Sequence, residues 1–280
     1  MFKIINPIVF LMLVFTTSVA QKTTIMTYNI RLDIASDGEN AWPNRKDFVV
    51  DQIKFYNPDI FGIQEGTPNQ TQYLHDKLTD YNYIGVGRDG GDNGEYSAIF
   101  YNSKKFTVDK ANTFWLSQTP DSISKGWDAS YNRICTYGLF TNKTTNEKLW
   151  VFNTHLDHVG NEARKKGLAL ILDKIAEVNS EEFPVVLTGD FNLEPENPII
   201  ADVKLKLTDA KEIAQDVVFG PSGTFNGFNF NEPVTRRIDY IFVSPKNINV
   251  VKYAVLSDSK DLKYPSDHLP VYVELELLKK

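Results

Sequence analysis

Short apolar runs rich in β-branched and aromatic residues recur throughout the chain, and no other feature constrains the fold more strongly. Runs of this length and composition are typical of strands buried in a sheet. Near the C-terminus, four apolar residues alternate with polar ones across 271–277, which indicates a half-buried strand. The other predicted strands are 24–29, 60–64, 97–101, 149–153, 185–189 and 238–243.

Three segments between these strands are predicted to be helices. The first, 45–56, follows Asn44 as its N-cap, and the second begins at Thr67-Pro68 with proline at the first helical position. The third spans 162–177, and its apolar stripe consists of Leu168, Ile171, Leu172 and Ile175. Such a mixture of elements favours sheets that are sandwiched between helices, although periodicity alone does not give the strand order.

The N-terminus has the pattern of an export signal. Lys3 precedes an unbroken apolar run at 8–15, and Ser18-Val19-Ala20 is a small-residue cleavage site. We therefore expect residues 1–20 to be a signal peptide that is cut after Ala20, and the mature protein to be secreted or periplasmic. The rival interpretation, an uncleaved anchor, requires a longer apolar stretch. We expect residues 21–280 to form one domain, monomeric and without stable membrane insertion.

Most of the apolar runs end in carboxylate, amide or imidazole side chains. Asn29, Glu65 and Asp190 each stand at the end of such a run, and Asp239 heads another. Such endings converge when they lie at one rim of a sheet, where sites are commonly built. Carboxylate and amide oxygens suit a hard divalent cation, Mg²⁺ or Mn²⁺. The candidate metal ligands are Asn29, Glu65 and Asp267.

Several other classes of protein are excluded by what the sequence lacks. It contains no HExxH, P-loop, GxGxxG or GxSxG motif, which argues against an HExxH-type zinc site, a nucleotide cofactor and a serine esterase. Cys135 is the single cysteine, so the fold contains no intrachain disulfide, and we expect this thiol to be buried. The net charge of −6 gives no general attraction to nucleic acid or anionic membranes.

Two of the four histidines, His155 and His268, lie within the polar endings. An imidazole beside a carboxylate can be held in one tautomer and kept protonated near pH 7, which suits contact with a phosphate oxygen. Asp157 and His158 lie directly beside His155, either as support for it or as surface residues.

Seven short motifs follow one another in a fixed order. They are MTYNIR at 26–31, GIQE at 62–65, EYSAIFY at 95–101, NTHLDH at 153–158, GDFN at 189–192, RIDYIFV at 237–243 and SDHLPV at 266–271. In content and order they resemble the endonuclease/exonuclease/phosphatase superfamily, which includes DNase I, inositol polyphosphate 5-phosphatases, sphingomyelinases and deadenylases. The resemblance implies a DNase I-like α+β fold, a four-layer α/β/β/α sandwich of two mostly antiparallel sheets flanked by helices. It also implies a metal-dependent phosphoric ester hydrolase.

The resemblance assigns a role to individual residues. Asn29 and Glu65 would hold the metal ion, with Asp267 near it. Asp190 would orient or deprotonate a water that attacks in line, without a covalent enzyme intermediate, and Asn192 would contact the phosphate.

The same resemblance implies a set of imidazole and arginine contacts. Asp239 would orient His268, and Glu95 would pair with His155, which itself binds the phosphate. Arg133 would contact the phosphate as well, and a surface salt bridge is the alternative for this residue.

The substrate is left open by the sequence. The candidates are extracellular DNA or RNA, a small phosphate ester, and a phospholipid headgroup as in the sphingomyelinases. The acidic composition favours a small or single-stranded phosphoester, because binding to the phosphate backbone of a nucleic-acid duplex relies on Lys and Arg. A non-catalytic binding protein on the same scaffold is the alternative from another class, and the intact set of motif residues argues against it.

An aromatic segment at 113–128 resembles secreted bacterial members of the superfamily. Trp115 and Trp127 in this segment, and Trp42 outside it, either stack on substrate or pack the edge of the sandwich.

Overall fold

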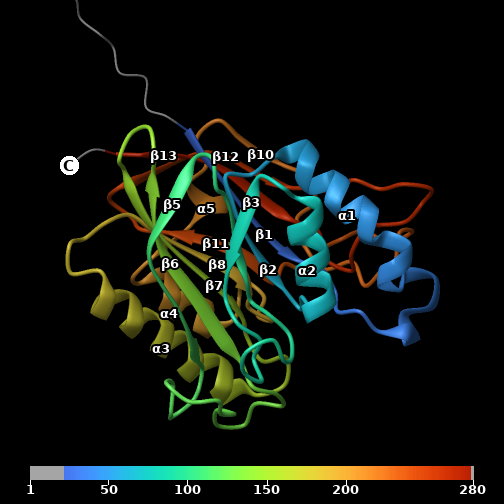
Figure 1. Cartoon of the computed structure of the whole chain (residues 1–280), viewed down its shortest axis with the longest axis horizontal. Coiled ribbons are helices and arrows are strands. Elements are labelled where there is room, and N and C mark those ends of the chain that lie inside the picture. Colours follow the sequence, from blue (N-terminus) through green and yellow to red (C-terminus); the bar gives the residue numbers. More distant parts are fainter. Residues whose placement is uncertain (1–21, 279–280) are drawn as a thin grey trace, which may run out of the picture.

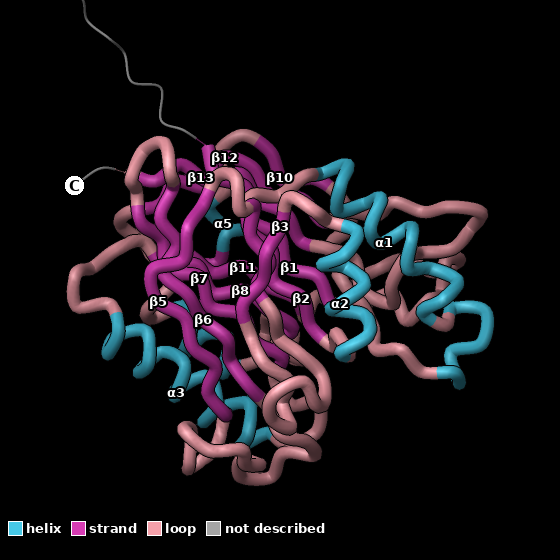
Figure 2. Tube along the Cα trace, in the orientation of Figure 1, coloured by secondary structure: helices cyan, strands magenta, loops and turns pink. Residues whose placement is uncertain are grey.

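Two sheets pack face to face in the computed structural model, which describes residues 22–278 (Figure 1 and Figure 2). The seven-stranded sheet contains, in spatial order, β10 (Val217–Phe219), β12 (Ile248–Val255), β13 (Val271–Leu277), β1 (Lys22–Asn29), β2 (Ile60–Gln64), β4 (Ile99–Asn102) and β3 (Tyr81–Ile84). The six-stranded sheet contains β5 (Phe106–Trp115), β6 (Ile134–Asn142), β7 (Lys148–His155), β8 (Val185–Asp190), β11 (Asp239–Val243) and β9 (Thr208–Asp209). Neighbouring strands are mostly antiparallel; the parallel pairs are β1–β2, β7–β8 and β10–β12.

Helices cover the outer face of each sheet (Figure 1). α1 (Trp42–Tyr56) and α2 (Pro68–Lys77) lie against the seven-stranded sheet, whereas α3 (Asn161–Val178) and α4 (Pro198–Lys204) lie against the six-stranded sheet. The remaining helices are short connections, η1 (Ala35–Asn40), a 3-10 helix, and α5 (Ala210–Ile213). The predicted four-layer α+β sandwich is therefore confirmed.

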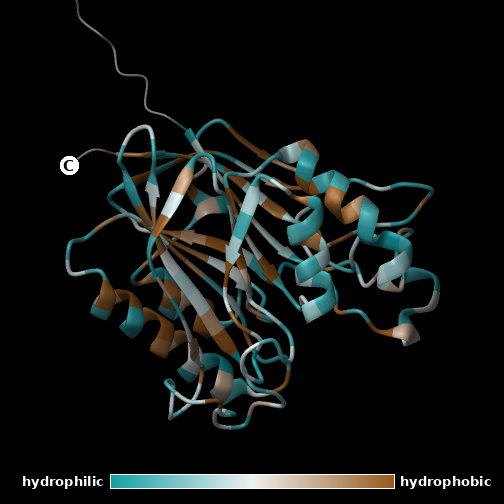
Figure 3. Ribbon diagram, viewed as in Figure 1, coloured by the Kyte–Doolittle hydropathy of each residue, from teal (hydrophilic) through white to brown (hydrophobic). Residues whose placement is uncertain are grey.

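The apolar periodicity of the sequence accounts for the packing of these layers. In β13 the residues Val271, Val273 and Leu275 are fully buried between the sheets, while the residues between them are partly exposed. In α3, Leu168 and Ile171 are buried against the six-stranded sheet, as the stripe predicts. Figure 3 shows the same separation, with hydrophobic residues gathered in the central strands and both kinds of residue along α3. Cys135 is buried in β6, as predicted.

The first helix begins earlier than the sequence predicts. It starts at Trp42 with Ala41 as the N-cap, because Pro43 provides the fixed φ that a first helical turn requires. Asn44 is therefore not the cap; its side-chain amide donates to the carbonyl groups of Gly38 and Glu39. The second helix begins as predicted, and Thr67 forms a capping box with Gln70.

Across residues 22–278, none of the helices combines the length and the apolar character that crossing a bilayer requires. The predicted signal peptide at 1–20 lies outside the described residues, so it stays a prediction.

A buried ion pair joins β9 to the chain just before β11. Arg237 Nη2 lies 2.6 Å from both carboxylate oxygens of Asp209, and both residues are buried. We expect Asp209→Ala to lower the free energy of unfolding by about 3–5 kcal/mol, because it leaves a buried guanidinium without its counter-charge. Urea denaturation measures this change. The control is Asp109→Ala, which breaks an exposed pair with Lys148 and should cost less than about 1 kcal/mol. Equal losses in the two variants would contradict the prediction.

Candidate active site

The register of the strands brings the polar endings together at one rim of the sandwich. In the six-stranded sheet His155 of β7 is paired with Asp190 of β8, and Asp239 of β11 is paired with the same Asp190. In the seven-stranded sheet β1 ends at Asn29 beside the end of β2, which Glu65 follows. The predicted convergence of these endings is thus observed in the structure.

A cavity of about 540 Å³ opens at this rim between the two sheets. Eight of the predicted site residues line it, namely Glu65, Glu95, Arg133, His155, Asp190, Asn192, Asp267 and His268. Asn29 and Asp239, the remaining two, are buried behind this lining, where each contacts a residue that faces the cavity.

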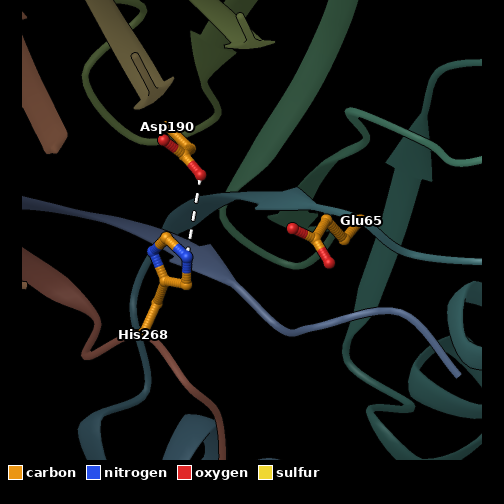
Figure 4. A group of neighbouring side chains, drawn as sticks. All are labelled: Glu65, Asp190 and His268. Atoms are coloured by element: carbon orange, nitrogen blue, oxygen red, sulfur yellow. Dashed lines mark ion pairs between the residues drawn. The ribbon is translucent and has the colours of Figure 1, made fainter. Parts of the chain in front are cut away.

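Asp190 lies at the centre of the hydrogen-bond network. Its Oδ2 accepts a hydrogen bond of 3.0 Å from Asn29 Nδ2, and its Oδ1 accepts one of 2.9 Å from the backbone N–H of Asn192. The same Oδ2 lies 3.5 Å from His155 Nε2 and 3.7 Å from His268 Nε2, the latter contact being drawn in Figure 4. Burial, and then the nearby charge of Asp239, raise the pKa of the Asp190 carboxyl group. A buried carboxyl group with a raised pKa is suited to accept a proton near neutral pH.

The surroundings of the two imidazoles shift their pKa values in opposite directions. His268 Nδ1 lies 2.9 Å from Asp239 Oδ2; burial opposes the charge of His268, but Asp239 and Asp190 raise its pKa to about 10. In contrast, burial and the positive charge of Arg133 lower the pKa of His155 well below its ordinary value. The expectation that a neighbouring carboxylate keeps an imidazole protonated therefore holds for His268 and not for His155. Asn192 Nδ2 lies 3.1 Å from His155 Nε2.

Glu95 has a different partner from the one that the resemblance implies. Its Oε2 lies 2.8 Å from Arg88 Nη1, and no hydrogen bond joins it to His155 within the described part of the chain. The cause is local, because the backbone N–H of Arg88 donates to the Glu95 carbonyl at the base of the loop 89–94 and so sets the two side chains beside each other. Burial raises the pKa of Glu95, although the charge of Arg88 opposes the rise.

Arg133 is held by a buried carboxylate and does not form a surface salt bridge. Its Nε lies 3.2 Å from Asp157 Oδ2, and both residues are at least 95% buried, with exposures of 5% and 1%. Asp157 also accepts hydrogen bonds from the backbone N–H groups of Val159 and Gly160, which outweigh its burial and lower its pKa to about 2. Asp157 therefore supports Arg133 from behind, whereas the exposed His158 reaches the cavity.

The tryptophans pack within the protein. Trp115 Nε1 donates to the carbonyl oxygen of Arg88 at 2.7 Å, and the Trp127 ring lies beneath Lys166. Trp42 is 3% exposed and contacts Tyr73 edge-on. Because the cavity lining contains none of these three residues, the structure favours packing over stacking on substrate.

Several residues of the cavity were not predicted from the sequence. Arg31 lies 3.8 Å from Asp267, and its place two residues after Asn29 is a signal that points to the same rim. Arg88 and Tyr131 form one wall, and Phe225 and Arg236 line the cavity as well. Their positions depend on loops, for which the apolar pattern of the sequence gives no signal.

The donor atoms at the rim fit a divalent cation. Atoms of Glu65, Asp190 and His268 lie within 4.8 Å of one another (Figure 4). The two carboxylates suit a metal ion, whereas the raised pKa of His268 disfavours the neutral imidazole that a metal requires. Asp267 adds a further carboxylate, and burial raises its pKa although the charge of His268 opposes the rise. Carboxylate oxygens supplemented by the Asn29 amide are the ligands that hard cations prefer.

The sequence profile of the endonuclease/exonuclease/phosphatase family matches residues 26–268, which contain every site residue described above. The chain belongs to the endonuclease/exonuclease/phosphatase family. Membership in this family and the arrangement of the site support a phosphate-ester hydrolase.

Solved structures of this family share the whole fold. A family protein from Bacteroides thetaiotaomicron is 38% identical with a TM-score of 0.88, and the alignment covers 94% of this chain and 100% of that one. The mannosyl-6-phosphatase of Bacteroides thetaiotaomicron VPI-5482 is 39% identical with a TM-score of 0.86, covering 90% of this chain and 99% of that one.

Curated relatives are longer than the region that they share with this chain. An uncharacterized protein of Acanthamoeba polyphaga mimivirus is 31% identical over 162 residues, which represent 55% of this chain and 60% of that protein.

Proposed function

We propose that this protein is an exported, divalent-metal-dependent phosphatase of small phosphate esters, with sugar phosphates as its substrate class. The convergence of His155, Asp190 and His268 on one cavity of about 540 Å³ is the observation that carries the proposal. The 39% identical mannosyl-6-phosphatase supports a sugar phosphate as the substrate. The signal-like sequence at 1–20 supports export. A mature N-terminus at Gln21 would agree with export, and an exported protein that retains Met1 would contradict cleavage.

The residues of the cavity have complementary tasks in such a reaction. Asp190 accepts the proton of the attacking water, since its carboxyl group has a raised pKa and lies at the centre of the network. Protonated His268 faces the phosphoryl oxygens with a positive charge that Asp239 sustains. Arg133, held by Asp157, supplies a second fixed cation, while the side-chain N–H groups of Asn192 and His155 would donate to the remaining oxygen.

Asn29, Glu65 and Asp267 would hold the metal ion, which we propose to be Mg²⁺ or Mn²⁺. When bound, such an ion neutralises charge that develops on the phosphoryl oxygens. Within the protein, Asn29 orients two of the acids, because its Nδ2 donates to Glu65 Oε1 and to Asp190 Oδ2 at 3.0 Å each.

A substrate panel assayed with and without EDTA tests this proposal. The panel contains mannose 6-phosphate, p-nitrophenyl phosphate, bis-p-nitrophenyl phosphate, RNA, plasmid DNA and sphingomyelin. We expect hydrolysis of mannose 6-phosphate that EDTA abolishes and that Mg²⁺ or Mn²⁺ restores. Hydrolysis restricted to the diesters, polynucleotides or sphingomyelin would contradict the substrate class, and full activity in EDTA would contradict the metal dependence.

A further inference from the structure

One wall of the cavity has no task in the hydrolysis proposed above. It consists of Arg88, Glu95 and Tyr131, which we call the side wall. Arg88 and Glu95 are mostly buried, with side-chain exposures of 13% and 15%, whereas Tyr131 is 51% exposed. The side wall borders His155 and Arg133, so a group attached to a phosphate at those residues would reach it.

The side wall is held rigidly from several directions. Trp115 Nε1 donates to the carbonyl oxygen of Arg88, and Asn132 Nδ2, next to Tyr131 in the chain, donates to Asp89 Oδ1 at 2.9 Å. The Arg88 guanidinium lies 4.7 Å from the centre of the Tyr131 ring, and the His158 ring stacks on the same tyrosine at 6.0 Å. Fixed polar groups of this kind bind a ligand without first losing conformational entropy.

The hydrogen-bonding groups of the side wall match hydroxyl groups better than a second phosphate. The charge of Arg88 is already neutralised by Glu95, which reduces its attraction for an anion. Among the described residues, neither Glu95 Oε1 nor the phenolic oxygen of Tyr131 has a hydrogen-bond partner, so one acceptor and one donor–acceptor group are free for a ligand. The guanidinium adds donors beside them.

The same geometry disfavours a nucleobase. Stacking requires an open aromatic face, and Arg88, Arg133 and His158 already lie against the Tyr131 ring, which reduces the surface left for a base. The tyrosine also offers its hydroxyl group, which suits the alternating donors and acceptors of a polyol.

We propose that Arg88, Glu95 and Tyr131 bind the hydroxyl groups of the alcohol portion of the substrate and so select sugar phosphates over simple alkyl phosphates. This inference rests on the proposed function. It gives Glu95 a substrate-binding role in place of the orientation of His155 that the superfamily resemblance implies.

The test compares two ligands that share a phosphate and differ in their hydroxyl groups, mannose 6-phosphate and methyl phosphate. Dissociation constants are measured by calorimetry with Mg²⁺ in an Asp190→Asn background, so that neither ligand is consumed. Tyr131→Phe, which keeps the ring, should weaken mannose 6-phosphate binding by roughly threefold to tenfold. Arg88→Met combined with Glu95→Gln preserves the local net charge and should weaken it by about tenfold or more.

Methyl phosphate binding should change by less than about twofold in each of these variants, because the phosphate contacts remain. Lys252→Met is the matched control; it breaks an ion pair with Glu274 outside the cavity and should change neither ligand's dissociation constant. In the active background, kcat for methyl phosphate in the charge-preserving double variant reports separately on any role of Glu95 in the reaction itself.

Three results would overturn the inference. They are equal weakening of both ligands, unchanged binding of mannose 6-phosphate, and tighter binding of AMP than of mannose 6-phosphate. A fall of kcat for methyl phosphate by about a hundredfold in the double variant would instead assign Glu95 to the orientation of His155. The proposed function and the proposed role of the side wall fail separately. Even if the protein hydrolyses no phosphomonoester, calorimetry still reveals whether the side wall discriminates between the two ligands.

Discussion

Replacing Asp190 with asparagine is expected to lower kcat for phosphate-ester hydrolysis by about 10²–10⁴-fold, the range over which a positioned general base acts. The substitution keeps the size of the side chain and removes its ability to accept the proton of the water. The hydrogen bonds from Asn29 and from the Asn192 backbone fix the Asp190 carboxylate at this position. No other base takes its place there when the carboxylate is removed. Steady-state kinetics on mannose 6-phosphate with saturating Mg²⁺ measure the effect.

The stability of the same variant separates this chemical loss from misfolding. Asp190 is a buried carboxyl group whose pKa is raised by burial and by Asp239, so its negative charge is costly to the folded state. We therefore expect Asp190→Asn to unfold at the same temperature as the wild type or above it. Asp202→Asn, an exposed residue of α4, is the matched control and should keep full activity. Activity within tenfold of the wild type in Asp190→Asn would contradict the assignment.

The sequence predicts much of this site because its residues stand at the ends of apolar strands. Strand ends are local features of the sequence. The registers of β7, β8 and β11 then place three residues at such ends side by side, namely His155, Asp190 and Asp239. The strand order itself is not readable from periodicity. It depends on non-local pairings, such as the parallel contact of β1 with β2.

The sequence analysis missed β6 and β12 although both are apolar and mostly buried, whereas other missed parts lack an apolar pattern. β5 was missed because it is an edge strand in which half of the ten residues are exposed. The pairing of Arg88 with Glu95 was missed for a related reason. It arises from a glycine-containing turn that reverses the chain, with Gly87 bridged to Tyr96, and nothing in the spacing of Glu95 from the later motifs reveals it.

His268→Ala is expected to lower kcat by about 10²–10⁴-fold as well, because it removes the protonated imidazole that faces the phosphoryl oxygens. Asp239→Asn should have a smaller effect of the same kind. His268 is the only hydrogen-bond partner of the Asp239 carboxylate among the described residues, since Asp239 Oδ1 is buried without one. Asp239 thus acts on the reaction through the position and charge of His268.

That dependence makes a sharper prediction for the two substitutions together. If Asp239 works only through His268, the variant that carries both Asp239→Asn and His268→Ala should be no slower than His268→Ala alone, because the second residue has nothing left to position. The comparison of kcat among the wild type, the two single variants and the double variant measures this coupling. Multiplicative losses would show that Asp239 acts independently of His268. In that case the charge of Asp239 would directly raise the pKa of Asp190, with which it is paired in the register of β8 and β11.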